Sequence, residues 1–135
     1  MTKVFVDSNV LLRFLIADDV EQRAKAKALL ERGANGEVSL LTGPPVFFEI
    51  SWVLRKAYKK SREEVLDILT GLMGLPGLDL TDRSILEEAL TLAGAAGMEF
   101  ADAYVATLAK SAGATELATF NRKHFEGLID LYPLE

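Results

Sequence analysis

The chain has 135 residues, of which 50% are hydrophobic and 26% charged, with a net charge of −5 and no cysteine. These values exclude a disordered chain, a disulfide framework and a thiolate metal site, and they argue against a strongly basic nucleic-acid-binding protein. We expect a single domain over residues 1–135. The start of the chain runs directly into a strand-like segment and no apolar stretch reaches the roughly 18–20 residues of a membrane span, so we expect a cytoplasmic protein without a signal peptide or membrane segment.

Short strand patterns alternate with longer helical patterns along the chain. Pro44 and Pro45 suit the first turn of a helix. Ser61 and Glu64 have the spacing of a capping box, and Asp82 suits an N-cap. The expected strands are residues 3–7, 38–42, 78–80, 116–119 and 129–131, and the expected helices are residues 9–16, 20–32, 43 to about 59, 61 to about 74, 82 to between 94 and 97, and 101–112.

This alternation predicts the fold class. Strands separated by helices favour parallel pairing with right-handed crossovers. We therefore expect an α/β protein, a three-layer α/β/α sandwich with a short, mainly parallel central sheet. In such proteins the functional crevice lies beyond the carboxyl ends of the strands.

Three carboxylates each stand alone inside an apolar run. Asp7 ends the first strand, Glu49 lies in the first turns of the helix after the second strand, and Asp102 opens a later helix. A buried ionised carboxylate is normally paired or binds a cation. We therefore expect these three acids, together with Asn121 just beyond the 116–119 strand, to converge at one edge of the sheet.

Each acid also has a purely structural interpretation. In that interpretation Asp7 is only an N-cap, and Asp102 is only a first-turn acid stabilised by the helix dipole. Glu49 lies past the cap and has Trp52 and Val53 one turn away, so a pocket suits it better than solvent.

The residue types favour one kind of chemistry. Carboxylates are the ligands that Mg²⁺ and Mn²⁺ prefer. The absence of cysteine and the presence of a single histidine, His124, disfavour a zinc site and leave a serine triad only one candidate base. No phosphate-binding glycine motif occurs. Metal-assisted hydrolysis of a phosphodiester by a cation-activated water is what remains.

Four segments resemble, in order, the motifs of PIN-domain nucleases. They are residues 4–11, 48–50, 100–104 and 117–121. A stand-alone domain of this length is most similar to the toxins of VapBC-type toxin–antitoxin pairs. The resemblance implies an endoribonuclease in which Asp7, Glu49 and Asp102 bind Mg²⁺ or Mn²⁺ and activate water to cut RNA. It also implies a homodimer and a small antitoxin protein that covers the site.

The resemblance also implies roles for neighbouring residues. Ser8 and Thr119 match small hydroxyl positions beside the site, where they orient water or ligands, or else are ordinary cap and strand-end residues. Asn121 stands where many members carry a fourth acid and is counted among the catalytic positions. We therefore expect one firm metal site and a second filled only with substrate. Asp79, Asp82 and Glu99 are the acids considered as compensation, and Glu99, three residues before Asp102, is the nearest of them in sequence.

Other interpretations stay open. The basic cluster at residues 55–62 is either a solvated helix end or a phosphate-binding rim with Tyr58 for stacking. The acidic net charge and Asn121 favour the alternative of a PIN-like module that binds RNA or a protein partner without cleaving. A receiver-type phosphotransfer domain is disfavoured because no aspartate occurs between Asp19 and Asp67. Phe47, Phe48 and Trp52 are expected in the core.

Overall fold

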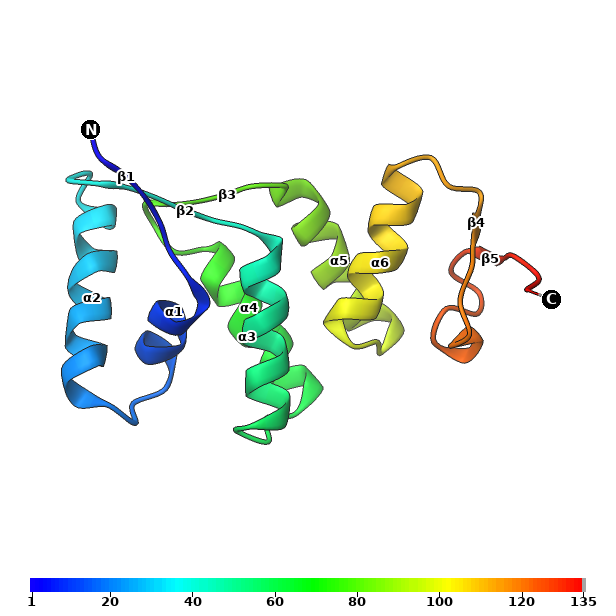
Figure 1. The fold of residues 1–135 in the computed structure, drawn as a ribbon, viewed down its shortest axis with the longest axis horizontal. Coiled ribbons are helices and arrows are strands. Elements are labelled where there is room, and N and C mark those ends of the chain that lie inside the picture. The colour runs from blue at the N-terminus through cyan, green and yellow to red at the C-terminus, as the bar shows by residue number, and fades with distance from the viewer. Residues whose placement is uncertain (135) are drawn as a thin grey trace.

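The computed structural model describes residues 1–134 and shows helices surrounding short parallel strands (Figure 1). Every expected strand and helix is present, which confirms the α/β class. No helix in this described part of the chain is both long and apolar enough to cross a membrane. The elements are β1 (Lys3–Phe5), α1 (Ser8–Leu15), α2 (Val20–Ala34), β2 (Ser39–Thr42), α3 (Pro44–Lys56), α4 (Arg62–Met73), β3 (Leu78–Leu80), α5 (Arg83–Ala96), α6 (Phe100–Ser111), β4 (Glu116–Leu117), the 3₁₀-helix η1 (Arg122–His124) and β5 (Asp130–Leu131).

The strands form two sheets. β1, β2 and β3 pair in that order, all parallel, with Phe5 opposite Leu41 and Leu40 opposite Leu78. β4 pairs only with β5, also in parallel. Figure 1 shows the two sheets towards opposite ends of the long axis, with α5 and α6 between them. The parallel pairing is as expected, but the strand that leads to Asn121 does not belong to the sheet that contains β1.

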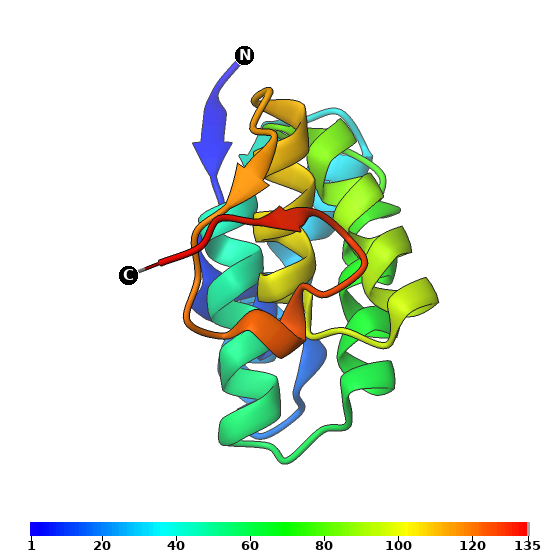
Figure 2. The same ribbon diagram turned by 90° about the vertical axis from the view of Figure 1, so that its right-hand side faces the viewer.

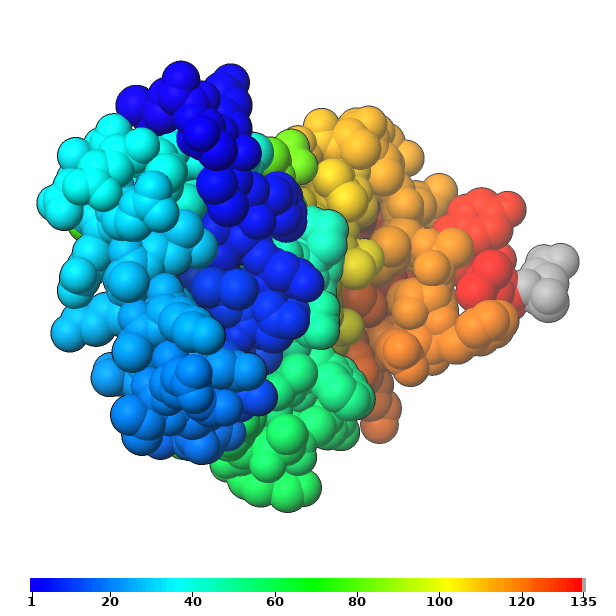
Figure 3. Space-filling model, turned by 60° about the vertical axis from the view of Figure 1, so that its left-hand side comes forward, coloured from blue at the N-terminus to red at the C-terminus, as the bar shows by residue number. Residues whose placement is uncertain are grey.

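The packing of α6 explains this separation. α6 packs mainly along α5 and makes a smaller contact with α3. Figure 2, in which β4 and β5 face the viewer, shows α3 and α6 side by side behind them. The chain therefore leaves α6 beyond the helices and not beside β1. In the space-filling view, the C-terminal segment lies on the opposite side of α3 from α1 and α2 (Figure 3).

Local hydrogen bonds position the ends of the first two strands. The Asp7 side chain caps α1 by accepting a hydrogen bond from the Ser8 N–H. The buried Thr42 hydroxyl donates to the Val6 carbonyl at 2.9 Å, which ties the carboxyl end of β1 to that of β2. Asp82 occupies the expected N-cap position of α5, but its backbone is left-handed and its side chain makes no capping hydrogen bond.

The main core lies between the sheet and the helices and includes Phe47, which is fully buried. Phe48 is half-buried and packs edge-to-face on Tyr104, with ring centroids 4.9 Å apart. The expectation that Trp52 is a core residue is wrong, because its side chain is 63% exposed. With 3.6 residues per turn, Trp52 lies on the face of α3 opposite the buried Ile50 and Leu54.

The capping box at the start of α4 is expected to contribute measurably to stability. The Ser61 hydroxyl accepts a hydrogen bond from the Glu64 N–H, and the Glu64 carboxylate accepts one from the Ser61 N–H. We expect Ser61→Ala to lower the free energy of unfolding by about 1 kcal/mol in urea denaturation. Ser84→Ala, at an exposed position in the first turn of α5, is the control. Equal stability of both variants would contradict this assignment.

Candidate functional site

Asp7 lies at the carboxyl end of β1, where the chain turns into α1. Its Oδ1 accepts a hydrogen bond from the Ser8 N–H at 2.7 Å, so the capping role considered from the sequence is confirmed. The Asp7 side chain is exposed, whereas Ser8 is only 3% exposed. None of the ion pairs in residues 1–134 involves Asp7. Its carboxylate therefore caps a helix and still faces solvent.

Glu49 projects from the outward side of α3. The expectation that it lies in a pocket is wrong, because the residue is exposed. Glu49 and Trp52 are three positions apart, so they share one side of the helix, away from the buried Ile50. Within the described chain Glu49 forms no ion pair, and its carboxylate is open to solvent.

Asp102 is in the first turn of α6 and has a partner that the sequence did not suggest. Its Oδ2 lies 3.0 Å from Nδ1 of His124, which belongs to η1, and the two side chains are 29% and 53% exposed. Because the sequence assigned no role to His124, this contact was missed. The only signal was that the single histidine follows the Asn121 motif closely.

The remaining predicted positions make local contacts. Glu99 precedes α6 and binds the Arg55 guanidinium, with Nε and Nη2 donating to its two carboxylate oxygens. This contact raises the pKa of Arg55 above its ordinary value, chiefly through the hydrogen bonds to Glu99. The Thr119 Oγ1 accepts a hydrogen bond from the Asn121 N–H at 3.0 Å, and the Asn121 side chain is exposed. Glu99 is thus committed to Arg55.

The carboxylates of Asp7, Glu49 and Asp102 have the chemistry that a divalent cation requires, but they are not arranged around a common point. Hard oxygen donors suit Mg²⁺ or Mn²⁺. Within residues 1–134, however, no three histidine, cysteine, aspartate or glutamate side chains lie close enough to hold a metal. Asp7, Glu49 and Asp102 are therefore not gathered into one metal-binding group in this arrangement, and β4, which leads to Asn121, lies in a different sheet from β1. The donor chemistry of the three carboxylates fits a divalent cation, whereas their placement here does not assemble a three-carboxylate site.

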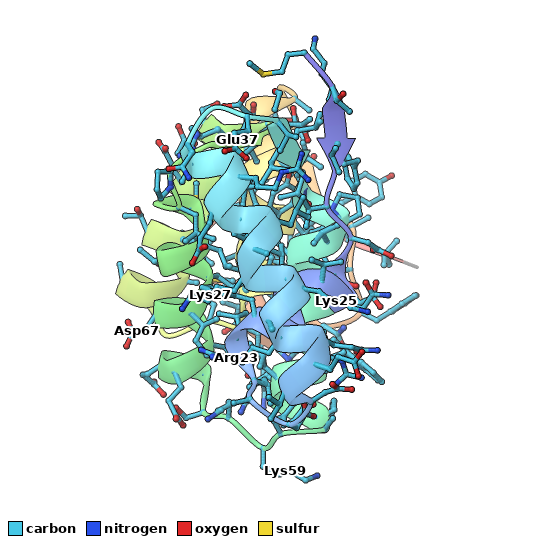
Figure 4. The ribbon with its side chains drawn as sticks, turned by 90° about the vertical axis from the view of Figure 1, so that its left-hand side faces the viewer. Arg23, Lys25, Lys27, Glu37, Lys59 and Asp67 are labelled. Carbon is cyan, nitrogen blue, oxygen red and sulfur yellow. The ribbon has the colours of Figure 1, made fainter. Side chains whose placement is uncertain are left out.

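One surface hollow, of about 460 Å³, lies between α1 and α2. Its cations are already neutralised: Arg13 contacts Asp18 at 3.0 Å, and Lys25 lies 3.7 Å from Glu21. The Tyr58 hydroxyl also donates to Asp18, and this hydrogen bond is the main cause that lowers the pKa of Asp18. Figure 4 shows α2 from the outside of the molecule, with Lys25 labelled.

A second hollow, of about 450 Å³, lies between α3 and the start of α6. It combines two aromatic side chains with three cations. Its lining residues are Phe48, Ser51, Trp52, Arg55, Lys56, Lys59, Glu99 and Ala101.

Comparison with known proteins agrees with the topology. The profile of the PIN domain matches residues 4–128, which is nearly the whole chain and includes Asp7, Glu49, Asp102 and Asn121. No curated protein matches the chain. PIN domains are generally nucleases and typically bind divalent metals, and the short parallel sheet with six helices in the described residues is consistent with this fold. The chain belongs to the PIN domain family.

Proposed function

We propose that the chain is a metal-dependent endoribonuclease that hydrolyses RNA phosphodiesters as the toxin of a type II toxin–antitoxin pair. The observation that carries this proposal is the PIN domain match over residues 4–128, since members of this family are generally nucleases. The matched region contains the three acids that stand alone in apolar runs, Asp7, Glu49 and Asp102. Their carboxylates are the ligands we assign to Mg²⁺ or Mn²⁺, with Asn121 as a neutral fourth position.

The proposal places a requirement on the structure. Asp7 and Glu49 are exposed and outside every ion pair of the described residues, so both are accessible to a cation. Asp102 faces His124 instead. A site that uses all three acids therefore requires α6 to bring Asp102 closer to the other two than it is in the arrangement described above.

We also propose that the chain works as a single domain in the cytoplasm and forms a homodimer. An antitoxin protein would cover its site. Apolar side chains at the surface are available for such contacts, as Phe5 is 56% exposed and Phe120 is 91% exposed. Val105 and Leu108 add an apolar strip along α6.

A second candidate function is a PIN-like module that binds RNA or a protein partner without cutting. Two observations favour it: no three acids are gathered within residues 1–134, and Asn121 contributes no charge where many members carry an acid. This module would bind the same RNA with and without a divalent cation.

The test is cleavage of a total-RNA pool by the purified chain with Mn²⁺ or with EDTA. We expect discrete fragments with Mn²⁺ and none with EDTA. We also expect none with Glu49→Gln, because it removes the carboxylate at an exposed position that the fold does not need. Glu88→Gln, at an exposed position on α5, is the matched control and should cleave normally. Undiminished cleavage in EDTA would contradict metal dependence, and no cleavage by the folded wild type would favour the binding module.

A further inference from the structure

The hollow between α3 and the start of α6 has a composition that no packing role explains. Trp52 lines it and is 63% exposed, although a large aromatic side chain gains most from burial. Phe48 forms part of the wall and is half-buried against Phe100 and Tyr104. The hollow therefore combines the exposed indole of Trp52 with a wall in which Phe48 is held by its packing against the core.

The charge on this hollow is positive. Arg55 is neutralised by Glu99, but none of the ion pairs in residues 1–134 involves Lys56 or Lys59. Figure 4 shows Lys59 in the turn after α3, with its side chain reaching away from the body of the molecule. Two free ammonium groups therefore flank an exposed indole, on a protein whose net charge is −5. The hollow between α1 and α2 differs, since its cations are paired with acids.

We propose that this hollow is a nucleotide-binding subsite for single-stranded RNA. A base stacks on Trp52, and Lys56 and Lys59 contact the flanking phosphates. Stacking on an aromatic side chain combined with cations along the backbone is how proteins bind single strands without reading their sequence. A base inside a duplex is already stacked on its neighbours, so the subsite selects unpaired segments. RNA as the ligand rests on the proposed function.

The position of the subsite gives it a use. Trp52 is three residues after Glu49 and shares its side of α3. An RNA segment held there runs past Glu49, one of the three acids assigned to the nuclease. Trp52 is thus a positioning residue that directs an unpaired nucleotide towards Glu49.

The same charges argue against a second copy of this chain as the occupant. A two-fold contact places the same patch of both copies face to face. It would bring Lys56 and Lys59 of one copy against the same lysines of the other, with no acid besides Glu99 in the lining, and Glu99 is bound to Arg55. An RNA backbone instead supplies the negative charge that these lysines lack.

The chain provides its own probe, because Trp52 is its only tryptophan. The experiment titrates the wild type, in EDTA to prevent cleavage, with an oligouridylate about ten nucleotides long. We expect saturable quenching of the Trp52 fluorescence and much weaker quenching by an RNA duplex of the same length. A labelled copy of the oligouridylate, followed by fluorescence polarisation, measures the affinity of variants that lack the indole.

Substitutions separate the contribution of base stacking to RNA affinity from that of the lysine charges. We expect Trp52→Ala to weaken binding about tenfold and Trp52→Phe to weaken it less, since phenylalanine still stacks. Lys56→Ala and Lys59→Ala should each reduce the steepness of the plot of log affinity against log salt concentration by about 0.7. Tyr132→Ala and Lys110→Ala, an exposed aromatic residue and an exposed lysine outside the hollow, are the matched controls and should bind like the wild type.

The outcomes distinguish this subsite from the proposed function. If the wild type cleaves RNA with Mn²⁺ while Trp52→Ala binds and cleaves equally well, the subsite is wrong and the nuclease stands. If the wild type neither binds nor cleaves RNA, both are wrong. If RNA leaves the fluorescence unchanged and Trp52→Ala converts a dimer to a monomer in sedimentation, the hollow is an interface between copies. Quenching without cleavage would retain the subsite and favour the binding module.

Discussion

Replacing Asp7 with asparagine is expected to lower RNA cleavage by at least about 100-fold without destabilising the protein. Loss of a residue that only supports a metal ligand commonly costs 10–100-fold in affinity or activity, so loss of a ligand should reach at least the upper end of that range. Asparagine caps helices as well as aspartate does, and its side-chain oxygen can still accept the Ser8 N–H. The substitution therefore removes the negative charge and keeps the helix start.

Asp7→Ala provides the comparison. It removes both the charge and the cap of α1, so we expect equally low cleavage and a free energy of unfolding lower by about 1 kcal/mol. Cleavage rates with Mn²⁺ and urea denaturation of both variants give the two readouts. Near-normal cleavage by Asp7→Asn would show that Asp7 is only a helix cap, which is the structural alternative that its hydrogen bond with Ser8 supports.

Local signals predicted the helices and strands well. Pro44 and Pro45 occupy the first turn of α3, and the Ser61 and Glu64 capping box starts α4 as expected. These signals work because a proline or a cap acts on the backbone within one turn. The end of α3 was less well predicted, since the helix stops at Lys56 and not near residue 59, and no proline or glycine marks that end.

The arrangement of the candidate site depends on longer-range packing and was not predictable in the same way. The expectation that Asn121 meets the three acids assumed that the strand before it belongs to the same sheet as β1, yet β4 has only two paired residues and pairs with β5. So short a strand carries little information on its partner. The exposure of Glu49 and Trp52 follows from which side of α3 meets the core. The contact between Asp102 and His124 depends on how η1 folds back on α6.

A close approach between two backbone segments leads to the largest expected effect on stability. Gly77 precedes β3 and has a φ of +78°, and a Cβ built there would overlap the carbonyl group of Gly33 near the end of α2 and lie 2.8 Å from the Ala34 nitrogen. These are backbone atoms, which cannot rotate away as a side chain can. Gly36 has nearly the same φ, +77°, but a Cβ there would meet no atom within 4 Å.

The two glycines therefore form a matched pair. We expect Gly36→Ala to lower the free energy of unfolding by about 1 kcal/mol, the cost of a left-handed conformation for a residue with a Cβ. Gly77→Ala adds the overlap with α2, so we expect a loss of about 3 kcal/mol or more, measured by urea denaturation of both variants. The excess of the second loss over the first measures how firmly α2 is held against the start of β3. Equal losses would mean that the end of α2 moves aside freely, and the position of the central sheet against α2 would then not depend on this contact.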